Sequence, residues 1–337
     1  MGQAPVFYTI STHRFYGYKF NLYLHRPTKL KEARLKIPLY ARESRFEKQY
    51  LTREWRKRQA LKILKECAVE FSDRPRMAIF AHDHIGAQIN LFGLYEKGDI
   101  EFLLSFLKHQ YPDFLEKPAI DVGANIGNHT VEFSKNFTKV YSFEPEDLNF
   151  ALLSVNTKSL KNVEIFKVAL SDKIGRGTLQ LTPGNFGSTR LSDPNLQSNS
   201  HPSCILKKLD DFSDAISAFG FLKIDVEGHE AAVLRGGQKA ILENMPIIAF
   251  EQLRGEIKNG SSETIEILRR LGYKNFIKFE RTISIFGIKV RRTGFFARWF
   301  GKICKVREVA NEIKSFKQTN YNFLLAVPPP CEKLNKV

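Results

Sequence analysis

Cysteine is scarce in this chain of 337 residues, and its four cysteines are scattered without a C-x-x-C pair. Zinc sites and disulfide frameworks usually show close cysteine spacings, so we expect neither. The chain also lacks a run of 18 apolar residues, so no transmembrane helix is expected. Its first 20 residues lack the apolar core of a secretory signal. These absences predict a cytoplasmic protein.

Acidic residues are outnumbered, with 36 Asp and Glu against 52 Lys and Arg, which gives a formal net charge of +16. Residues 26–65 hold 14 basic and 4 acidic residues, residues 281–319 hold 10 and 2, and the remainder is close to neutral. Basic segments attract phosphates, anionic sugars and anionic lipid headgroups, or simply form a solvated surface. We expect the basic segments to bind an anionic glycan or an anionic membrane surface. In the second case the protein would be peripheral at the inner face of the membrane. No RNA-binding signature is visible, so nucleic acid is not expected.

From Pro118 onward, short apolar strands alternate with helices, which predicts a parallel sheet covered on both faces. The expected strands are KPAIDVG, KVYSFEP, NVEIFKVALSD, FLKIDVEGHE, MPIIAFEQ, YKNFIKFE and a final NYNFLLAVP, with a further small strand at 175–182. Residues 1–92 are expected to form a basic, largely helical extension, with two short strands around Asp83. Residues 93–337 form the predicted catalytic domain, which contains a basic, aromatic insert at 281–319 and an exposed loop at 181–202.

The first expected strand ends in DVGANIG, a glycine turn before a helix, which is typical of nucleotide-type cofactor sites. A dinucleotide fingerprint has three glycines, the second of which lets the backbone approach a pyrophosphate. Here Asn125 lies between Gly123 and Gly127, and the carboxylate of Asp121 precedes the turn. A carboxylate repels a pyrophosphate but attracts a sulfonium-bearing ligand. The alternative is that the glycines only form a tight turn.

Glu144 ends the next expected strand, where an acidic side chain can accept hydrogen bonds from ribose hydroxyls. Asp121 and Glu144 together favour S-adenosylmethionine over NAD. An NAD-dependent oxidoreductase stays an alternative, although the turn lacks the third glycine that such an enzyme needs. A second alternative, from another class, is a non-catalytic basic protein that keeps the fold and binds nucleic acid or a membrane.

The segments DVGANIGNHT, SFEPEDLNFALLSVN, VALSD, LKIDVEGHEAAVLRGG and IIAFEQ, in this order and spacing, resemble the FkbM family of S-adenosylmethionine-dependent methyltransferases. The resemblance covers roughly residues 93–279. It implies the class I methyltransferase fold, a Rossmann-like, mostly parallel sheet of seven strands with helices on both faces and an antiparallel last strand. It also implies O-methylation of a hydroxyl on a saccharide, a lipid-linked saccharide or a secondary metabolite.

The segment IDVEGHE offers the acid–base groups that such a reaction needs. On an extended chain Asp225 and Glu227 point to the same side, and Gly228 permits a turn into the next helix. The imidazole of His229 suits a base near neutral pH. We expect His229 or Asp225 to accept the proton of the acceptor hydroxyl, and Glu227 to orient the substrate or the base. The alternative is ordinary capping of a helix.

Glu251 ends the neighbouring strand and can join Asp225 and Glu227 in binding a substrate hydroxyl or a divalent ion. The spacing of the three carboxylates is not diagnostic, so we expect a metal-free mechanism. The family resemblance further marks Glu96 as a residue near the cofactor. Ser171 and Asp172 follow the third strand, where the adenine amino group is expected, unless they only form a turn.

Overall fold

The computed structural model describes residues 50–70, 77–81, 83–182, 185–191, 202–216, 218–285, 288–290, 304–313 and 315–329. The chain divides into two compact units, residues 1–54 and 55–337, and the fold below belongs to the second. A helix was expected in the basic extension, and α1 (Tyr50–Glu70) confirms its later part, whereas residues 29–49 lie outside the described residues. No helix among the described residues is both long and apolar enough to cross a bilayer.

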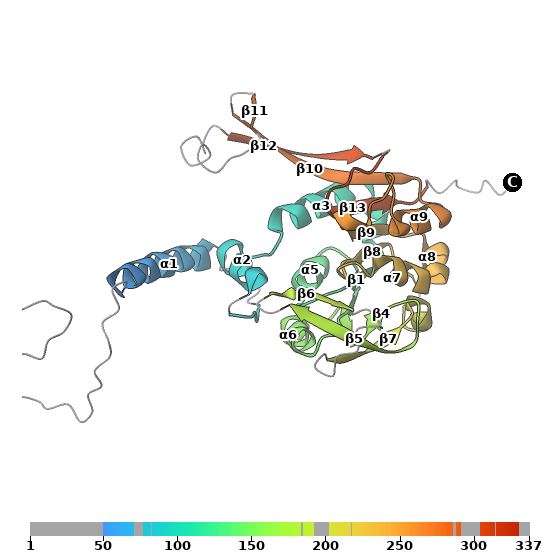
Figure 1. The fold of residues 1–337 in the computed structure, drawn as a ribbon, viewed down its shortest axis with the longest axis horizontal. Coiled ribbons are helices and arrows are strands. Elements are labelled where there is room, and N and C mark those ends of the chain that lie inside the picture. The colour runs from blue at the N-terminus through green and yellow to red at the C-terminus, as the bar shows by residue number, and fades with distance from the viewer. Residues whose placement is uncertain are drawn as a thin grey trace, which may run out of the picture. The chain divides into compact units, whose positions relative to one another are not determined.

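The central sheet has the strand order β11-β10-β13-β9-β8-β1-β2-β3, with β12 added beside β10 (Figure 1). Its parallel part consists of β1 (Ala119–Val122), β2 (Val140–Phe143), β3 (Val163–Phe166), β8 (Phe221–Ile224) and β9 (Ile247–Gln252). The last strand, β13 (Tyr321–Val327), runs antiparallel to both β9 and β10 (Asn275–Ile285). This order confirms the predicted class I methyltransferase fold. The strand order reverses between β1 and β8, which is where ligands bind in open α/β sheets.

The sheet has two more strands than the seven expected, and both come from the predicted insert at 281–319. Strand β10 runs beyond the core and pairs with β11 (Ile288–Val290) and with β12 (Cys304–Glu312). The β10–β12 pairing extends from Ile277 opposite Glu312 to Ile285 opposite Cys304. The described part of the insert therefore lengthens one edge of the sheet, as the upper part of Figure 1 shows.

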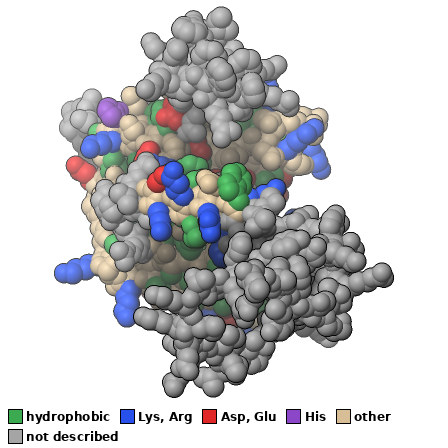
Figure 2. Space-filling model, turned by 90° about the vertical axis from the view of Figure 1, so that its left-hand side faces the viewer, with side chains coloured by type: hydrophobic (Ala, Val, Ile, Leu, Met, Phe, Trp, Pro, Cys, Tyr) green, Lys and Arg blue, Asp and Glu red, His purple; other side chains and the backbone are tan. Residues whose placement is uncertain are grey.

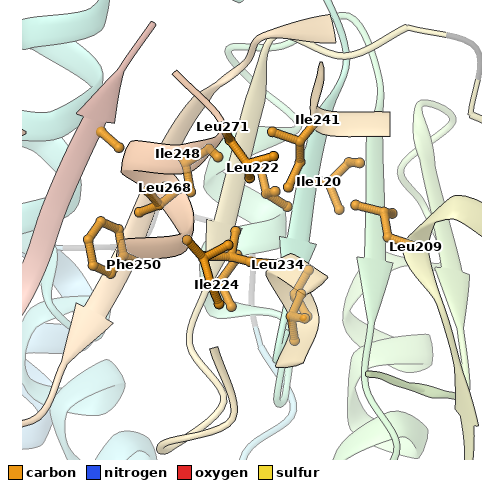
Figure 3. Close-up of a cluster of buried hydrophobic side chains, with 14 of the residues drawn as sticks. Ile120, Leu209, Leu222, Ile224, Leu234, Ile241, Ile248, Phe250, Leu268 and Leu271 are labelled. Atoms are coloured by element: carbon orange, nitrogen blue, oxygen red, sulfur yellow. The ribbon is translucent and has the colours of Figure 1, made fainter. Parts of the chain in front are cut away.

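Helices cover both faces of the sheet because alternate strand residues point to opposite sides. On one face Ala119, Phe221 and Ile247 pack against α3 (Lys97–Gln110) and α5 (Asn128–Phe133). On the other face Ile120, Leu222 and Ile248 pack against α7 (Glu230–Gly236), α8 (Gln238–Asn244) and α9 (Glu263–Arg270) (Figure 3). Each fully buried aliphatic side chain contributes about 1.5–3 kcal/mol, so these two layers stabilise the sheet.

The two short strands expected around Asp83 are wrong, because the segment forms a helix, α2 (His84–Phe92). The Asp83 carboxylate accepts a hydrogen bond from the Ile85 amide at 3.0 Å and caps the first turn. Ile85 and Ile89, four residues apart, are buried against Ile126 of the glycine turn, which is the helical spacing. Helix α2, which ends before position 93, thus packs against the glycine turn of the sheet domain. The predicted division at 92/93 stays a prediction.

A small second sheet, of order β4-β7-β5-β6, follows β3. It consists of β4 (Ala169–Leu170), β7 (Ser203–Lys207), β5 (Gly175–Thr182) and β6 (Asn185–Leu191). The expected small strand at 175–182 is confirmed. The loop expected at 181–202 is wrong in its first part, where β6 pairs with β5, while residues 192–201 lie outside the described residues. The remaining elements are α4 (Pro112–Leu115), α6 (Asp147–Thr157), and the 3-10 turns η1 (Leu209–Phe212) and η2 (Arg254–Glu256).

Lys and Arg side chains are spread over the face of the molecule in Figure 2 and do not gather in one patch on its coloured surface. Basic side chains of α1 are exposed, among them Arg56, Arg58 and Lys62. Large parts of the two basic segments, residues 26–49 and 291–303, lie outside the described residues. The anionic membrane or glycan partner therefore stays a prediction.

Candidate functional site

The glycine turn after β1 is built by three residues in the left-handed backbone region, Gly123 (φ 75°), Asn125 (φ 52°) and Gly127 (φ 92°). A Cβ atom on Gly123 would lie 1.9 Å from the Asp225 carbonyl oxygen, so only glycine fits between the ends of β1 and β8. The Gly123 and Ala124 amides both donate to the Phe143 carbonyl at 3.0 Å. The turn is therefore fixed to β2 on one side and to β8 on the other.

Glu144, at the end of β2, is tied directly to this turn. Its carboxylate accepts one hydrogen bond from the Asn125 amide (2.8 Å) and another from the Glu146 amide (2.9 Å). Burial raises the pKa of Glu144 to about 7, although both backbone hydrogen bonds oppose that rise. The side chain thus joins the turn to the start of α6 and lies at the wall of the pocket described below.

Asp121 lies beneath the turn and is fully buried. Its carboxylate accepts a hydrogen bond from the Thr130 hydroxyl at 2.7 Å and lies 3.1 Å from the ammonium of Lys223 on β8. Lys223 also donates to the Gly123 carbonyl at 3.0 Å. Burial opposes the charge on Lys223, but the carboxylates of Asp121 and Asp225 outweigh it and raise its pKa. This pair supports the turn from below.

Three carboxylates meet where β8 and β9 end. One oxygen from each of Asp225, Glu227 and Glu251 lies within 4.8 Å of the other two, and all three residues are half-buried. Glu227 has a left-handed backbone (φ 54°) directly before Gly228 (φ 97°), so the chain turns sharply after β8. Burial, followed by the charges of Asp225 and Glu227, raises the pKa of Glu251 to about 8.

The opposite wall is formed by Tyr95, Glu96, Asn128 and His129. The Asn128 side chain holds the Tyr95 backbone through its carbonyl and amide groups, each at 3.0 Å. Glu96 has a left-handed backbone (φ 52°) at the start of α3, and burial followed by the charge of Asp225 raises its pKa to about 7. The Nε2 of His129 lies 3.6 Å from the Glu96 carboxylate, and burial followed by Lys223 lowers the His129 pKa to about 4.

These groups enclose a pocket of about 160 Å³ at the carboxyl ends of β1, β2, β8 and β9. Seven of the predicted site residues line it: Glu96, Gly123, Asn125, Glu144, Asp225, Glu227 and Glu251. The other described lining residues are His84, Ile85, Tyr95, Ala124, Ile126, Asn128, His129, Asn149, Lys223 and Asn322. The carboxylates expected from two strand ends are thus brought together with the glycine turn.

Five predicted site residues lie outside this lining. Asp121 is beneath it and Gly127 is at the start of α5. The His229 imidazole is 3.0 Å from the Ser171 hydroxyl, and Asp172 forms an ion pair with Arg235 at 2.7 Å. His229 instead lines a small, mostly apolar pocket with residues such as Pro145, Leu170, Leu191 and Val226, which also reaches Gly123. His229 is therefore not grouped with the three carboxylates.

The sequence interpretation missed the wall residues Tyr95, Asn128 and His129, and the buried Lys223. A lysine within the otherwise apolar strand FLKI was a usable signal, because a buried ammonium needs acidic partners. His129 and Asn128 follow the turn directly, but which side chains of a short helix face a pocket depends on packing.

The chain is similar to known methyltransferases. Residues 121–274 match the family model described as the methyltransferase FkbM domain. The solved structure of methyltransferase FkbM from Methylobacillus flagellatus is 19% identical; the match covers 57% of this chain and 48% of that chain, with a TM-score of 0.31. This chain thus spans about half the length of that protein. No curated protein sequence matches the chain significantly.

Two other solved structures are similar to the chain at low scores. Precorrin-6y C5,15-methyltransferase from Geobacter metallireducens is 11% identical, over 68% of this chain and 87% of that one, with a TM-score of 0.37. The magnesium protoporphyrin IX methyltransferase of Synechocystis, solved with bound S-adenosylmethionine, is 7% identical, over 82% of this chain and all of that one, with a TM-score of 0.36. At such low scores the fold assignment rests on the strand order itself.

Proposed function

We propose, from the premise that residues 121–274 are a methyltransferase FkbM domain, that the protein transfers a methyl group from S-adenosylmethionine to a hydroxyl of a saccharide, a lipid-linked saccharide or a secondary metabolite. The observation that carries the proposal is the hydrogen-bonded connection of Glu144 to the glycine turn at the wall of an acidic pocket. A ribose that binds there meets an acidic acceptor at the end of β2, as in related nucleotide sites.

The residues present fit this donor. Gly123, Ala124 and Asn125 line the pocket, so the backbone of the glycine turn lies against it. The small apolar pocket that contains Pro145, Leu170 and Val226 shares Gly123 with the main pocket and suits an adenine ring. The surrounding carboxylates favour a ligand that carries sulfonium and ammonium groups. We assign the ribose to Glu144 and the amino-acid end to the wall with Glu96.

Bound S-adenosylmethionine supplies an electrophilic methyl group on a good leaving group, so the residues of this chain mainly align the two reactants. A neutral hydroxyl is a weak nucleophile and needs a proton acceptor within hydrogen-bond reach. Asp225 is the residue that we assign to this role, because it lines the pocket at the end of β8 beside Gly123. With the donor bound, this carboxylate would take the proton of the acceptor hydroxyl as the methyl group is transferred. Glu227 and Glu251 orient the acceptor.

His229, the other predicted proton acceptor, fits this role less well. Its Nε2 interacts with Ser171, and burial lowers its pKa. A place beside Pro145 and Leu170 suits contact with the adenine end of the donor, not with the acceptor. We therefore assign His229 and Ser171 to donor binding, with Asp172 holding Arg235.

The acceptor has an open groove through which it can enter. A groove of about 550 Å³ adjoins the main pocket and shares His84, Tyr95, Glu96 and Asn322 with it. Phe92, at the end of α2, lines this groove and is 51% exposed. An exposed ring beside amide groups suits stacking with a sugar, which needs an apolar face and hydrogen-bonding partners. This groove supports a saccharide as the acceptor.

The first experiment is calorimetric titration of the protein with S-adenosylmethionine. We expect Glu144→Gln to weaken binding about 10- to 100-fold, because the charge-assisted hydrogen bonds to the donor become neutral ones. Asp147→Asn is the matched control. Asp147 is an exposed carboxylate at the first residue of α6, three positions after Glu144, and it does not line the pocket. Binding of NADH in place of S-adenosylmethionine would contradict the proposal. Labelled methyl transfer to a panel of glycans then identifies the acceptor.

A further inference from the structure

The main pocket has a large excess of negative groups. Among the described residues that line it, five carry carboxylates, Glu96, Glu144, Asp225, Glu227 and Glu251, and Lys223 is the one that carries an ammonium. Carboxylates this close repel one another strongly in a partly buried site, unless they are protonated or a cation lies between them. The pocket therefore calls for positive charge.

Lys223 does not supply that charge to the whole group. Only 2% of its surface is exposed, and its ammonium interacts with Asp121 and the Gly123 carbonyl beneath the turn. It also lies 3.5 Å from Asp225, so its single charge is shared between that carboxylate and Asp121. One shared ammonium does not match the five carboxyl groups that line the pocket.

The three carboxylates there have a spacing that suits one metal ion. Hard divalent cations bind carboxylate oxygens at about 2.0–2.6 Å, so oxygens on one ion lie roughly 3–5 Å apart. One oxygen from each of Asp225, Glu227 and Glu251 lies within 4.8 Å of the others. Asp225 and Glu227 directly follow β8, Glu251 lies in the adjacent strand β9, and both strands are packed on both faces.

A second observation on the opposite wall also points to a ligand. His129 is 6% exposed and lines the same pocket, and its Nε2 is buried without a hydrogen-bond partner among the described residues. Its neighbour there is the Glu96 carboxylate at 3.6 Å, beyond hydrogen-bonding distance. A buried polar atom is costly when left unpaired. An imidazole nitrogen that faces an acidic pocket can bind a metal ion or a water molecule on that ion.

We propose that Asp225, Glu227 and Glu251 bind one hard divalent cation, of the Mg²⁺ or Mn²⁺ class, with His129 completing the site directly or through water. This proposal replaces the metal-free mechanism expected from the sequence. The cation would lie beside the donor pocket, where an oxygen of the acceptor can bind to it; that last role rests on the proposed function, whereas cation binding does not. Asp225 can hold the cation with one oxygen and leave the other for the hydroxyl proton.

The test is titration of the metal-free full-length protein with Mn²⁺ alone, followed by the loss of the electron paramagnetic resonance signal of free Mn²⁺. We expect one bound ion per chain. Asp225→Asn and Glu251→Gln, on different strands, should each weaken binding tenfold or more, because each removes a charged ligand. Glu243→Gln is the control: it changes an exposed carboxylate on α8 that does not line the pocket, and binding should stay the same.

Two results would overturn the cation site: no Mn²⁺ bound by the wild-type protein, or equal binding by the wild type, the two ligand variants and the control. Circular dichroism melts show whether the variants fold, and the two replacements relieve repulsion, so we expect folded proteins. Glu144→Gln separates this proposal from the donor site, because it should weaken S-adenosylmethionine binding and leave Mn²⁺ binding intact. Failure of either titration alone then counts against one proposal and not the other.

Discussion

Asp121 and Lys223 are opposite each other on neighbouring parallel strands, and their side chains form an ion pair of 3.1 Å in the interior. The sequence suggested that Asp121 acts directly on a cationic donor. In the structure the Asp121 carboxylate is buried beneath the glycine turn, where it contacts Thr130 and Lys223. Lys223 in turn donates a hydrogen bond to the Gly123 carbonyl. The pair thus holds the backbone of the glycine turn, against which the donor would bind, in its position above β1 and β8.

Lys223→Met should destabilise the protein by about 3–5 kcal/mol, because it leaves the buried Asp121 carboxylate without its cation. The double variant Asp121→Asn/Lys223→Met should lose less than the single one, since the amide is neutral and can still accept from Thr130. Urea unfolding at pH 7 of the two single variants, Lys223→Met and Asp121→Asn, and of the double variant measures these losses. A double variant whose loss of unfolding free energy equals the sum of the two single losses would show that the residues do not act as a pair.

Gly123→Ala should lose donor binding and destabilise the fold by several kcal/mol. The added methyl would overlap the Asp225 carbonyl, and the left-handed backbone (φ 75°) adds strain. Gly255→Ala is the control, because no atom lies within 4 Å of its added Cβ and its change should be within about 0.5 kcal/mol. Thermal melts and S-adenosylmethionine titration of the two variants test the contrast, and equal behaviour would contradict the packing described here.

Glu230 should make the protein less stable as the pH rises from about 4.5 to 7. Burial raises its pKa from 4.5 to about 7, so the folded state holds a proton that the unfolded state has already released in this range. The unfolding free energy therefore falls with pH up to the folded-state pKa. Glu230→Gln keeps an oxygen for the Val226 and Gly228 amides and should be more stable than the wild type at pH 8, by roughly 2–3 kcal/mol.

The comparison for Glu230→Gln is the difference between unfolding free energies at pH 5 and pH 8, measured in the same urea series. The wild type should show the larger drop. An identical drop in the two proteins would assign the pH dependence to other buried carboxyls, such as Glu144, and would sink this prediction.

Asn156→Ala should loosen the segment before α2. The Asn156 side chain binds the Ala78 amide (2.6 Å) and the Ala78 carbonyl (3.0 Å), and it also donates to the Ile126 carbonyl of the glycine turn (2.7 Å). Loss of these three hydrogen bonds should cost about 2–3 kcal/mol. Hydrogen exchange should then become faster at the Ala78 amide while the amides of β1 and β2 keep their protection. Unchanged exchange at Ala78 would contradict this role.

The sheet was predictable from the sequence because its strands are short apolar runs with helices between them. Asp83 and His84 were misread, since a helix of nine residues with an aspartate cap differs little in composition from two strands around a turn. The predicted exposed loop hid β6, which has few apolar residues and depends on pairing with β5. Pairing of distant segments leaves little trace in local sequence.

The acidic pocket was predictable in part, because carboxyl ends of parallel strands meet at one edge. Glu144, Asp225, Glu227 and Glu251 come together for that reason. Which of these carboxylates reaches the pocket was not predictable. Asp121 and Glu144 both lie near the glycine turn, but Asp121 is fully buried beneath it whereas Glu144 lines the pocket. His129 and Tyr95 join the site only through the packing of α3 and α5 against the sheet.

The position of α2 has a consequence for how acceptor choice can change. This helix lines both the pocket and the adjoining groove, while its sequence precedes residues 121–274, which match the methyltransferase FkbM domain model. It is held to that domain by Ile85 and Ile89 against Ile126, and by Asn156 through Ala78. If the proposed function holds and the acceptor enters through this groove, exchanging α2 between related proteins should change the acceptor while the glycine turn stays as it is.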